Sequence, residues 1–375
     1  MILLHPNLQM MLEGTKLIKS LSNTYTVAIL VCAHIFPNLR GSCALKLPNN
    51  ATVPGIFVFG DSVMDTGNNN YILTPCKSNF PPYGRDFPGG EATGRFSDGI
   101  VPSDIIAQAF GVKKFVPAYL DPSLSINEML TGVNFASSCS GYLPLTATYK
   151  YFSLSLENQL DMFKQYIVKV KAAVGEERAL EIVSQSIYVI CTGSNDFLYY
   201  YETQKSGNMS AYTDSVVNYA SGFLKRLYDI GARRIALGGA PPQGCLPAAR
   251  TNYGGQLRFI VERFNQDTLN FNLKLQTMLK SLQNTLQGSR FVYFDFYYTV
   301  LDLVQKPHDY GFEVVDKGCC GTGLFEEGPL CNIFSTLISC PNASKYVFWD
   351  ASHPTQAAYN IILARNINQT MSQFF

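Results

Sequence analysis

The chain has 375 residues, of which 47% are hydrophobic and 15% are charged, so it can bury one large core. This composition excludes a disordered or low-complexity chain. Lysine plus arginine number 29 against 28 aspartate plus glutamate, and a formal charge of +1 lacks the basic excess typical of proteins that bind nucleic acid or anionic membranes.

The first 44 residues differ from the rest of the chain. Two lysines precede a mostly apolar run over 25–36, and small residues follow up to Ala44. This order is typical of a secretory signal peptide. A run of about a dozen residues is too short for a membrane-spanning helix, which needs roughly 20, so a membrane anchor is the weaker alternative. We expect a signal over 1–44 and one secreted domain over 45–375, without stable membrane insertion.

Secretion changes how the cysteines are interpreted, because an oxidising compartment favours disulfides. Cys319, Cys320, Cys331 and Cys340 share one glycine-rich segment that has neither a histidine pair nor the Cys-x-x-Cys spacing of a zinc site. We expect these four to form disulfides among themselves or with a nearby cysteine, and three internal pairings remain open. Cys191 closes an apolar run and is expected to be a buried free thiol. Four glycosylation sequons fit the same compartment. They lie at Asn50, Asn208, Asn342 and Asn368.

The mature chain alternates strand-like and helix-like stretches. Short apolar runs predict strands over 56–59, 133–136, 187–191, 234–237 and 291–295. Helical spacing falls over 97–110, 156–170, 177–183, 216–230 and 257–286. Five strands with helical crossovers indicate a doubly wound α/β sheet, and no linker divides the chain.

The first apolar run stops abruptly at Gly60-Asp61-Ser62. Ser62 is therefore expected at the carboxyl end of a buried strand, which is the edge where ligands gather in open parallel sheets. Taken alone, this tripeptide more often marks a serine that only caps the next segment. Ser62 is a candidate nucleophile whose assignment depends on finding a base.

Only two histidines remain once the signal is removed. His308 lies in a turn-like stretch that we interpret as a surface loop. His353 follows Asp350 by three residues, so one turn of chain allows the carboxylate to hold Nδ1 while Nε2 faces a hydroxyl, as a serine nucleophile requires. Pro354 fits the first position of a helix starting just after. The alternative is a helix cap with a solvent-facing imidazole.

Four blocks occur in a fixed order: FGDSVMDTGNNN, GVNFAS, GSNDF and DASHPT. Together they resemble the GDSL esterase/lipase family, or SGNH hydrolases, in its secreted, extracellular-lipase-like plant branch. The resemblance spans about 54–368, and NFPPYGRDF, GRFSDG, PPQGCLP, GCCGTG and YVFWD are similar to that branch as well. It implies a three-layer α/β/α fold with a flavodoxin-like, five-stranded parallel sheet.

The resemblance also implies roles for single residues. Ser62 would be the nucleophile, His353 the general base and Asp350 the group that orients it. Asn195 would donate its side-chain amide to the oxyanion. Where the family commonly has a glycine or alanine whose backbone N–H contacts the oxyanion, this chain has Cys139. We expect Cys139 to donate through its backbone with a dispensable thiol, at a cost if its φ must be positive.

The implied activity is hydrolysis of small-molecule or lipid carboxylic esters through an acyl-enzyme, by a monomer in the cell wall or apoplast that needs no cofactor and no metal. Two alternatives stay open: a non-catalytic binding glycoprotein in which Cys139 spoils the oxyanion hole, and an acyltransferase that uses the same triad.

A trypsin-like protease is excluded because the only alanine-preceded histidine, His34, lies in the signal. An α/β-hydrolase elbow is excluded because Met64 replaces its second glycine. The aromatic run 199–201 either lines an acyl groove or belongs to the ordinary core and rim.

Overall fold

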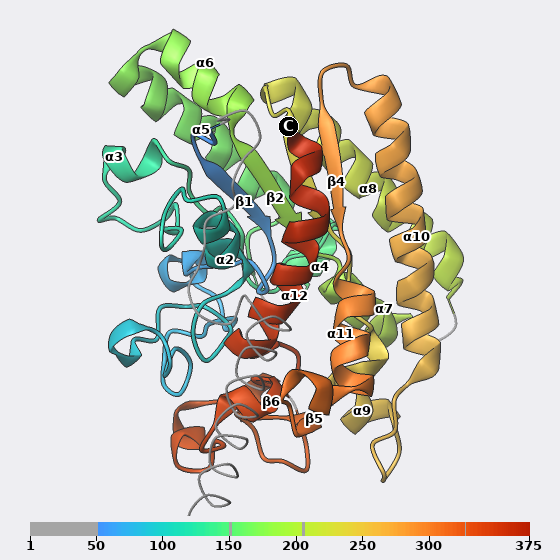
Figure 1. The fold of residues 1–375 in the computed structure, drawn as a ribbon. Coiled ribbons are helices and arrows are strands. Elements are labelled where there is room, and N and C mark those ends of the chain that lie inside the picture. Colours follow the sequence, from blue (N-terminus) through green and yellow to red (C-terminus); the bar gives the residue numbers. More distant parts are fainter. Residues whose placement is uncertain (1–51, 150–151, 205–206, 327) are drawn as a thin grey trace, which may run out of the picture. The chain divides into compact units, whose positions relative to one another are not determined.

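The computed structural model describes residues 52–149, 152–204, 207–326 and 328–375 (Figure 1). The expected signal over 1–44 and the sequon at Asn50 lie outside the described residues.

A four-stranded parallel sheet forms the centre of the domain. Its order is β1 (Ile56–Gly60), β2 (Ile187–Cys191), β3 (Arg234–Gly238) and β4 (Arg290–Phe294). The strands pair in register, with Ile56 beside Ile187 and Ile187 beside Arg234. Strands β1 and β2 are buried along their whole length, as expected for apolar runs covered on both faces. The sequence predicted all four strands to within one residue at each end.

The predicted fifth strand over 133–136 is an irregular segment between β1 and residues 117–119, which corrects the expected strand count. It runs parallel to β1: Val58 N donates to Val133 O over 3.2 Å, and Phe135 N donates to Val58 O over 2.8 Å. Only Asn134 forms a bridge with β1. Its side-chain oxygen accepts from Ala136 N over 2.7 Å, so a local loop competes with the ladder. With this segment counted, the spatial order is 2-1-3-4-5 in chain order, the flavodoxin-like arrangement.

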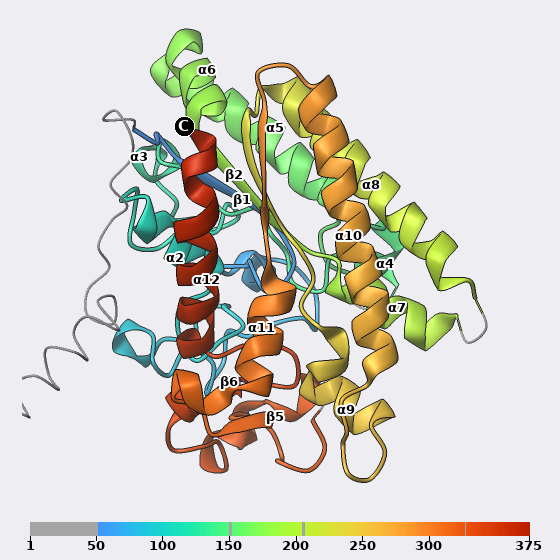
Figure 2. The same cartoon turned by 45° about the vertical axis from the view of Figure 1, so that its right-hand side comes forward.

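Helices cover both faces of the sheet (Figures 1 and 2). Along β1, Ile56 and Val58 face one core while Phe57 and Phe59 face the other. The first core is closed by α2 (Pro102–Ala109), α11 (Phe296–Gln305) and α12 (Gln356–Thr370). The second is closed by α5 (Leu156–Val174), α6 (Glu176–Gln185), α8 (Met209–Ile230) and α10 (Glu262–Thr285). Shorter helices are α3 (Ile126–Met129), α4 (Pro144–Thr148), α7 (Ser194–Thr203) and α9 (Pro247–Tyr253). The three layers therefore match the predicted architecture.

A small two-stranded sheet, β5 (Val314–Gly318) with β6 (Tyr346–Phe348), lies beyond the carboxyl end of the main sheet (Figures 1 and 2). The segment between its strands is closed by two disulfides, Cys319–Cys340 and Cys320–Cys331. The prediction that these four cysteines form disulfides is confirmed, and of the alternatives left open they pair among themselves. Cys191 is a buried free thiol, also as predicted. No helix in the described part of the chain is both long and apolar enough to cross a membrane.

Candidate active site

Ser62 lies on a tight turn directly after β1. Gly60 has a φ of 133°, and a Cβ there would lie 2.0 Å from Cys191 O, so only glycine fits. Asp61 closes the turn: its carboxylate accepts from Val63 N over 3.1 Å, and its carbonyl accepts from Met64 N over 3.0 Å. The turn therefore holds Ser62 at the carboxyl edge of the sheet, as the sequence predicted.

Three predicted residues meet at this edge although they are separated by almost the whole domain. The Ser62 Oγ lies 2.7 Å from His353 Nε2. Nδ1 of His353 lies 2.9 and 2.8 Å from the two carboxylate oxygens of Asp350. If Nδ1 carries its proton and donates it to Asp350, Nε2 is free to accept the serine proton. His308 lies exposed in a short 3-10 helix, Pro307–Tyr310.

Asp350 is held by more donors than the sequence indicated. Its oxygens accept from Ser352 N and His353 N, both over 2.8 Å, and from the Tyr83 hydroxyl over 2.7 Å. Burial acts to raise the pKa of Asp350, but the charge of His353 and these hydrogen bonds outweigh it and hold the pKa below its usual value. The carboxylate is thus ionised beside the imidazole. In the sequence, Tyr83 stood out only as part of the block NFPPYGRDF. No local pattern predicted its contact with Asp350, which is 267 residues away.

The segment 348–354 folds back on itself as a narrow loop. Trp349 N donates to His353 O over 2.7 Å, and Phe348 pairs with Pro354. Because this pairing keeps Pro354 extended, it does not begin a helix, which corrects the sequence prediction. Helix α12 begins at Gln356, whose N–H donates to Asp98 over 2.7 Å.

Asn195 lies in the first turn of α7, just after Gly193, which has a φ of 121°. Its Nδ2 donates to Ser140 O over 2.8 Å. An amide nitrogen carries two hydrogens, so this bond orients the group and leaves a second donor. The next residue, Asp196, accepts from Tyr142 N over 2.8 Å and from the Thr146 hydroxyl over 2.6 Å. These bonds attach α7 to the segment that carries Cys139.

Cys139 forms a disulfide with Cys76, with a Cα–Cα distance of 6.3 Å. The sequence analysis missed this bond and treated the thiol as dispensable. The φ of Cys139 is 64°, a left-handed conformation that costs a residue with a Cβ about 1–2 kcal/mol. Cys139 lies in a turn closed by Ser140 N, which donates to Ser137 O over 3.2 Å, and the disulfide anchors its side chain. Its backbone N–H has no acceptor among the described residues, and it stays a candidate oxyanion donor.

Side chains from the asparagine-rich end of the first block hydrogen-bond the segment that leads to Cys139. Asp65 accepts from the backbone N and the hydroxyl of Ser138, over 3.0 and 2.9 Å. Asn68 donates to Asn134 O and Ala136 O over 2.9 and 2.8 Å. These buried side chains fix the segment 134–138, a role that the sequence analysis did not assign.

Gln159 was also missed, since it lies within an ordinary helical pattern. Its side-chain oxygen accepts from Gly60 N and its side-chain nitrogen donates to Gly60 O, both over 2.9 Å. The same nitrogen donates to Ser140 Oγ over 3.3 Å. It therefore connects the Ser62 turn to the Cys139 segment.

Two buried acids flank the site. Burial raises the pKa of Asp61 to about 7, against the lowering effects of the Val63 N–H, the Thr192 hydroxyl and the charge of His353. Burial likewise raises the pKa of Asp196 to about 6. Within the described ranges, no group of three or more histidine, cysteine or acidic side chains is arranged to hold a metal ion.

Known proteins show the same sequence organisation. The profile of the GDSL-like Lipase/Acylhydrolase family matches residues 56–365. GDSL esterase/lipase At5g42170 of Arabidopsis thaliana is 48% identical over 326 residues, which cover 87% of this chain and 88% of the relative. GDSL esterase/lipase EXL3 of the same plant is 45% identical over 334 residues, which cover 88% and 91%. The chain therefore belongs to the GDSL-like lipase/acylhydrolase family, and its layered α/β fold with a parallel sheet is the fold of that family.

Proposed function

We propose that the protein is a secreted serine esterase or lipase that hydrolyses carboxylic esters through a covalent acyl-enzyme. The observation that carries this proposal is the continuous contact from Ser62 Oγ through His353 to buried Asp350, with distances of 2.7 and 2.8 Å. The relatives named above are themselves described as esterases or lipases.

In the first half of the reaction, Ser62 Oγ attacks the ester carbonyl while His353 Nε2 takes the serine proton. Asp350 stabilises the imidazolium that forms, because it is ionised and fixed by its own donors. Negative charge develops on the carbonyl oxygen, and the donors for it are the second N–H of Asn195 and the backbone N–H of Cys139.

In the second half, His353 returns the proton to the leaving alcohol, and the acyl group stays on Ser62. Water then attacks this ester with His353 again acting as base, which regenerates the serine. No step calls on a cofactor. The positive φ of Cys139 is compatible with this scheme because its backbone N–H has no acceptor among the described residues and stays available as a donor.

Export is part of the proposal. The apolar run over 25–36, the three disulfides and the sequons all support an oxidising, extracellular destination. N-terminal sequencing of protein from the culture medium should begin close to residue 45. A secreted product that begins at Met1 or Met10 contradicts cleavage of a signal.

The enzymatic proposal is tested by turnover of a short, soluble p-nitrophenyl ester. Ser62→Ala and His353→Ala should each lose nearly all activity, and the double variant should be little worse, because the groups act as a unit. Wild-type activity in Ser62→Ala contradicts the proposal because it shows that Ser62 is not the nucleophile. No turnover by the wild type also contradicts it and favours a binding glycoprotein. Turnover that yields a new ester when alcohol is added identifies an acyltransferase.

A further inference from the structure

The disulfide-closed segment between β5 and β6 exposes large apolar side chains. Phe334 and Leu337 are 83% and 93% exposed, and Ile333 and Ile338 are exposed beside them. These four residues lie on and next to the short 3-10 helix Ile333–Leu337, and we call them the apolar tip. Contiguous exposed apolar groups are uncommon on soluble monomers and mark interaction surfaces.

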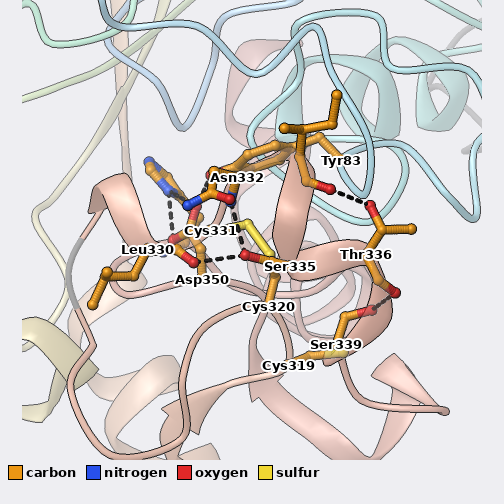
Figure 3. Close-up of a disulfide and its surroundings, with 12 residues drawn as sticks. Tyr83, Cys319, Cys320, Leu330, Cys331, Asn332, Ser335, Thr336, Ser339 and Asp350 are labelled. Carbon is orange, nitrogen blue, oxygen red and sulfur yellow. Dashed lines mark hydrogen bonds and ion pairs between the residues drawn. A yellow bond between two sulfur atoms is a disulfide. The ribbon is translucent and has the colours of Figure 1, made fainter.

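The tip is rigidly supported from inside (Figure 3). Ser335, in the middle of the helix, is buried; its hydroxyl donates to Leu330 O over 2.7 Å and accepts from Asn332 N over 3.0 Å. The disulfides Cys320–Cys331 and Cys319–Cys340 close the segment before and after the helix. Ser335 is thus held inward, and the apolar side chains of the helix are exposed together with Thr336.

The tip also lacks charge. From Gly328 to Ser344 the chain contains no acidic, basic or histidine residue. Binding to an anionic lipid surface relies on lysine and arginine beside the apolar groups. A surface that is apolar and uncharged instead complements an uncharged apolar phase.

The base of the tip adjoins the catalytic loop. Cys319 N donates to Phe348 O over 3.0 Å, and Cys320 N donates to Trp349 O over 2.6 Å, immediately before Asp350. Figure 3 shows the Cys320–Cys331 disulfide close to Asp350. Both ribbon views place β5 and β6 at the carboxyl edge of the main sheet, where Ser62 lies (Figures 1 and 2). A phase that contacts the tip therefore lies on the catalytic side of the molecule.

We propose that the apolar tip docks the enzyme on the surface of aggregated, uncharged lipid esters, so that its substrates are water-insoluble esters presented at an interface. This inference rests on the proposed esterase function and narrows its substrate class. Docking removes the tip from water and holds the active site next to a high local concentration of ester groups.

Docking is tested apart from catalysis with the Ser62→Ala protein and triolein emulsion droplets, by flotation. In that background, Phe334→Asp with Leu337→Asp should reduce the droplet-bound fraction at least about 10-fold, because two buried apolar contacts become buried charges. The matched control is Val168→Asp, which changes a 68% exposed apolar side chain on α5 and should leave flotation unchanged. Binding should be insensitive to salt.

Activity provides the second readout. In the otherwise wild-type protein, the double tip variant should keep kcat/KM for soluble p-nitrophenyl acetate, which also shows that it folds, while turnover of emulsified triolein falls about 10-fold. Equal flotation and equal triolein turnover in the tip variant overturn the docking proposal. The proposal is also overturned if the tip variant changes dimer formation in sedimentation but not flotation, or if binding to droplets requires anionic lipid. If the wild type turns over neither ester but Ser62→Ala floats through its tip, the proposed function fails while docking stands.

Discussion

The two halves of the site rely on polar bonds, disulfides and packing in different proportions. The Ser62 turn and the Cys139 segment are fixed mainly by buried polar side chains, such as Asp65, Asn68 and Gln159, that bond backbone groups, with one disulfide at Cys139. The Asp350–His353 loop also has hydrogen bonds to Asp350, but it rests in addition on two disulfides and on aromatic packing. Its small core is made of Tyr83, Phe96 and Trp349 with Cys319, Cys320, Cys331 and Cys340.

This difference has a consequence for function. A buried polar network is sensitive to each single partner, since an unpaired buried group costs about 1–3 kcal/mol. Disulfides and packing tolerate single polar changes better and depend on the oxidising compartment. Substitutions that alter only one bond should therefore damage the serine side more than the histidine side.

The largest expected effect in this comparison is at Asn195, on the serine side. Asn195→Ala removes the proposed oxyanion donor and should lower kcat for a soluble ester about 100- to 1,000-fold, with a smaller change in KM. Ser194→Ala, which changes a neighbouring hydroxyl that accepts from Gln243, is the matched control. A loss below about 5-fold in Asn195→Ala shows that the oxyanion hole lies elsewhere.

Two substitutions at Cys139 distinguish the contribution of its disulfide from the contribution of its positive φ. Cys139→Gly and Cys139→Ala both break the bond to Cys76, which closes a separation of 63 residues, so both should lose about 2–4 kcal/mol of unfolding free energy. Only glycine adopts a φ of 64° without strain. Turnover should therefore be roughly 10-fold lower in Cys139→Ala than in Cys139→Gly. Equal turnover in the two variants indicates that the left-handed conformation does not serve catalysis.

On the histidine side, Tyr83→Phe removes one of several donors to Asp350 without changing the packing of the ring. Turnover should fall only about 3- to 10-fold, and the free energy of unfolding at pH 7 by about 1–2 kcal/mol. Because the native pKa of Asp350 is lowered, its stabilisation is present above the unfolded pKa and is lost as the pH falls through the native one. The stability difference between Tyr83→Phe and wild type should therefore shrink in acid. A difference that stays constant over the whole acid range in which the protein is folded contradicts an ionised, Tyr83-bound Asp350.

The last prediction concerns stability alone and involves the buried acid beside Ser62. The folded state keeps the Asp61 proton up to a pKa of about 7, whereas the unfolded state releases it near its ordinary value, so this group makes stability fall as the pH rises between about 4 and 7. The shift is about three pKa units and each unit corresponds to about 1.4 kcal/mol, so Asp61→Asn should remove a decline of up to about 4 kcal/mol. Urea unfolding across this range measures it, and an unchanged slope means that Asp61 is ionised in the native protein.

The sequence predicted those parts of the molecule that depend on local pattern. The four sheet strands were predicted from their short apolar runs, of which β1 and β2 are buried along their whole length. The proximity of Ser62 to Asp350 and His353 was predicted because these residues lie in recognisable blocks. The strand at 133–136 was overpredicted because apolar residues flank Asn134, whose side chain replaces part of the ladder. Tyr83, Gln159 and the Cys76–Cys139 bond escaped because their partners lie 63 to 267 residues away, and no local pattern encodes such contacts.

The central claim is that Ser62 is a nucleophile activated by His353. It is tested most directly by treating the oxidised wild-type protein with a fluorophosphonate and locating the adduct by peptide mass spectrometry. The account predicts stoichiometric modification of Ser62 alone, labelling slowed at least about 1,000-fold in His353→Ala, and none in Ser62→Ala. Modification at another serine, or unchanged labelling of His353→Ala, contradicts it.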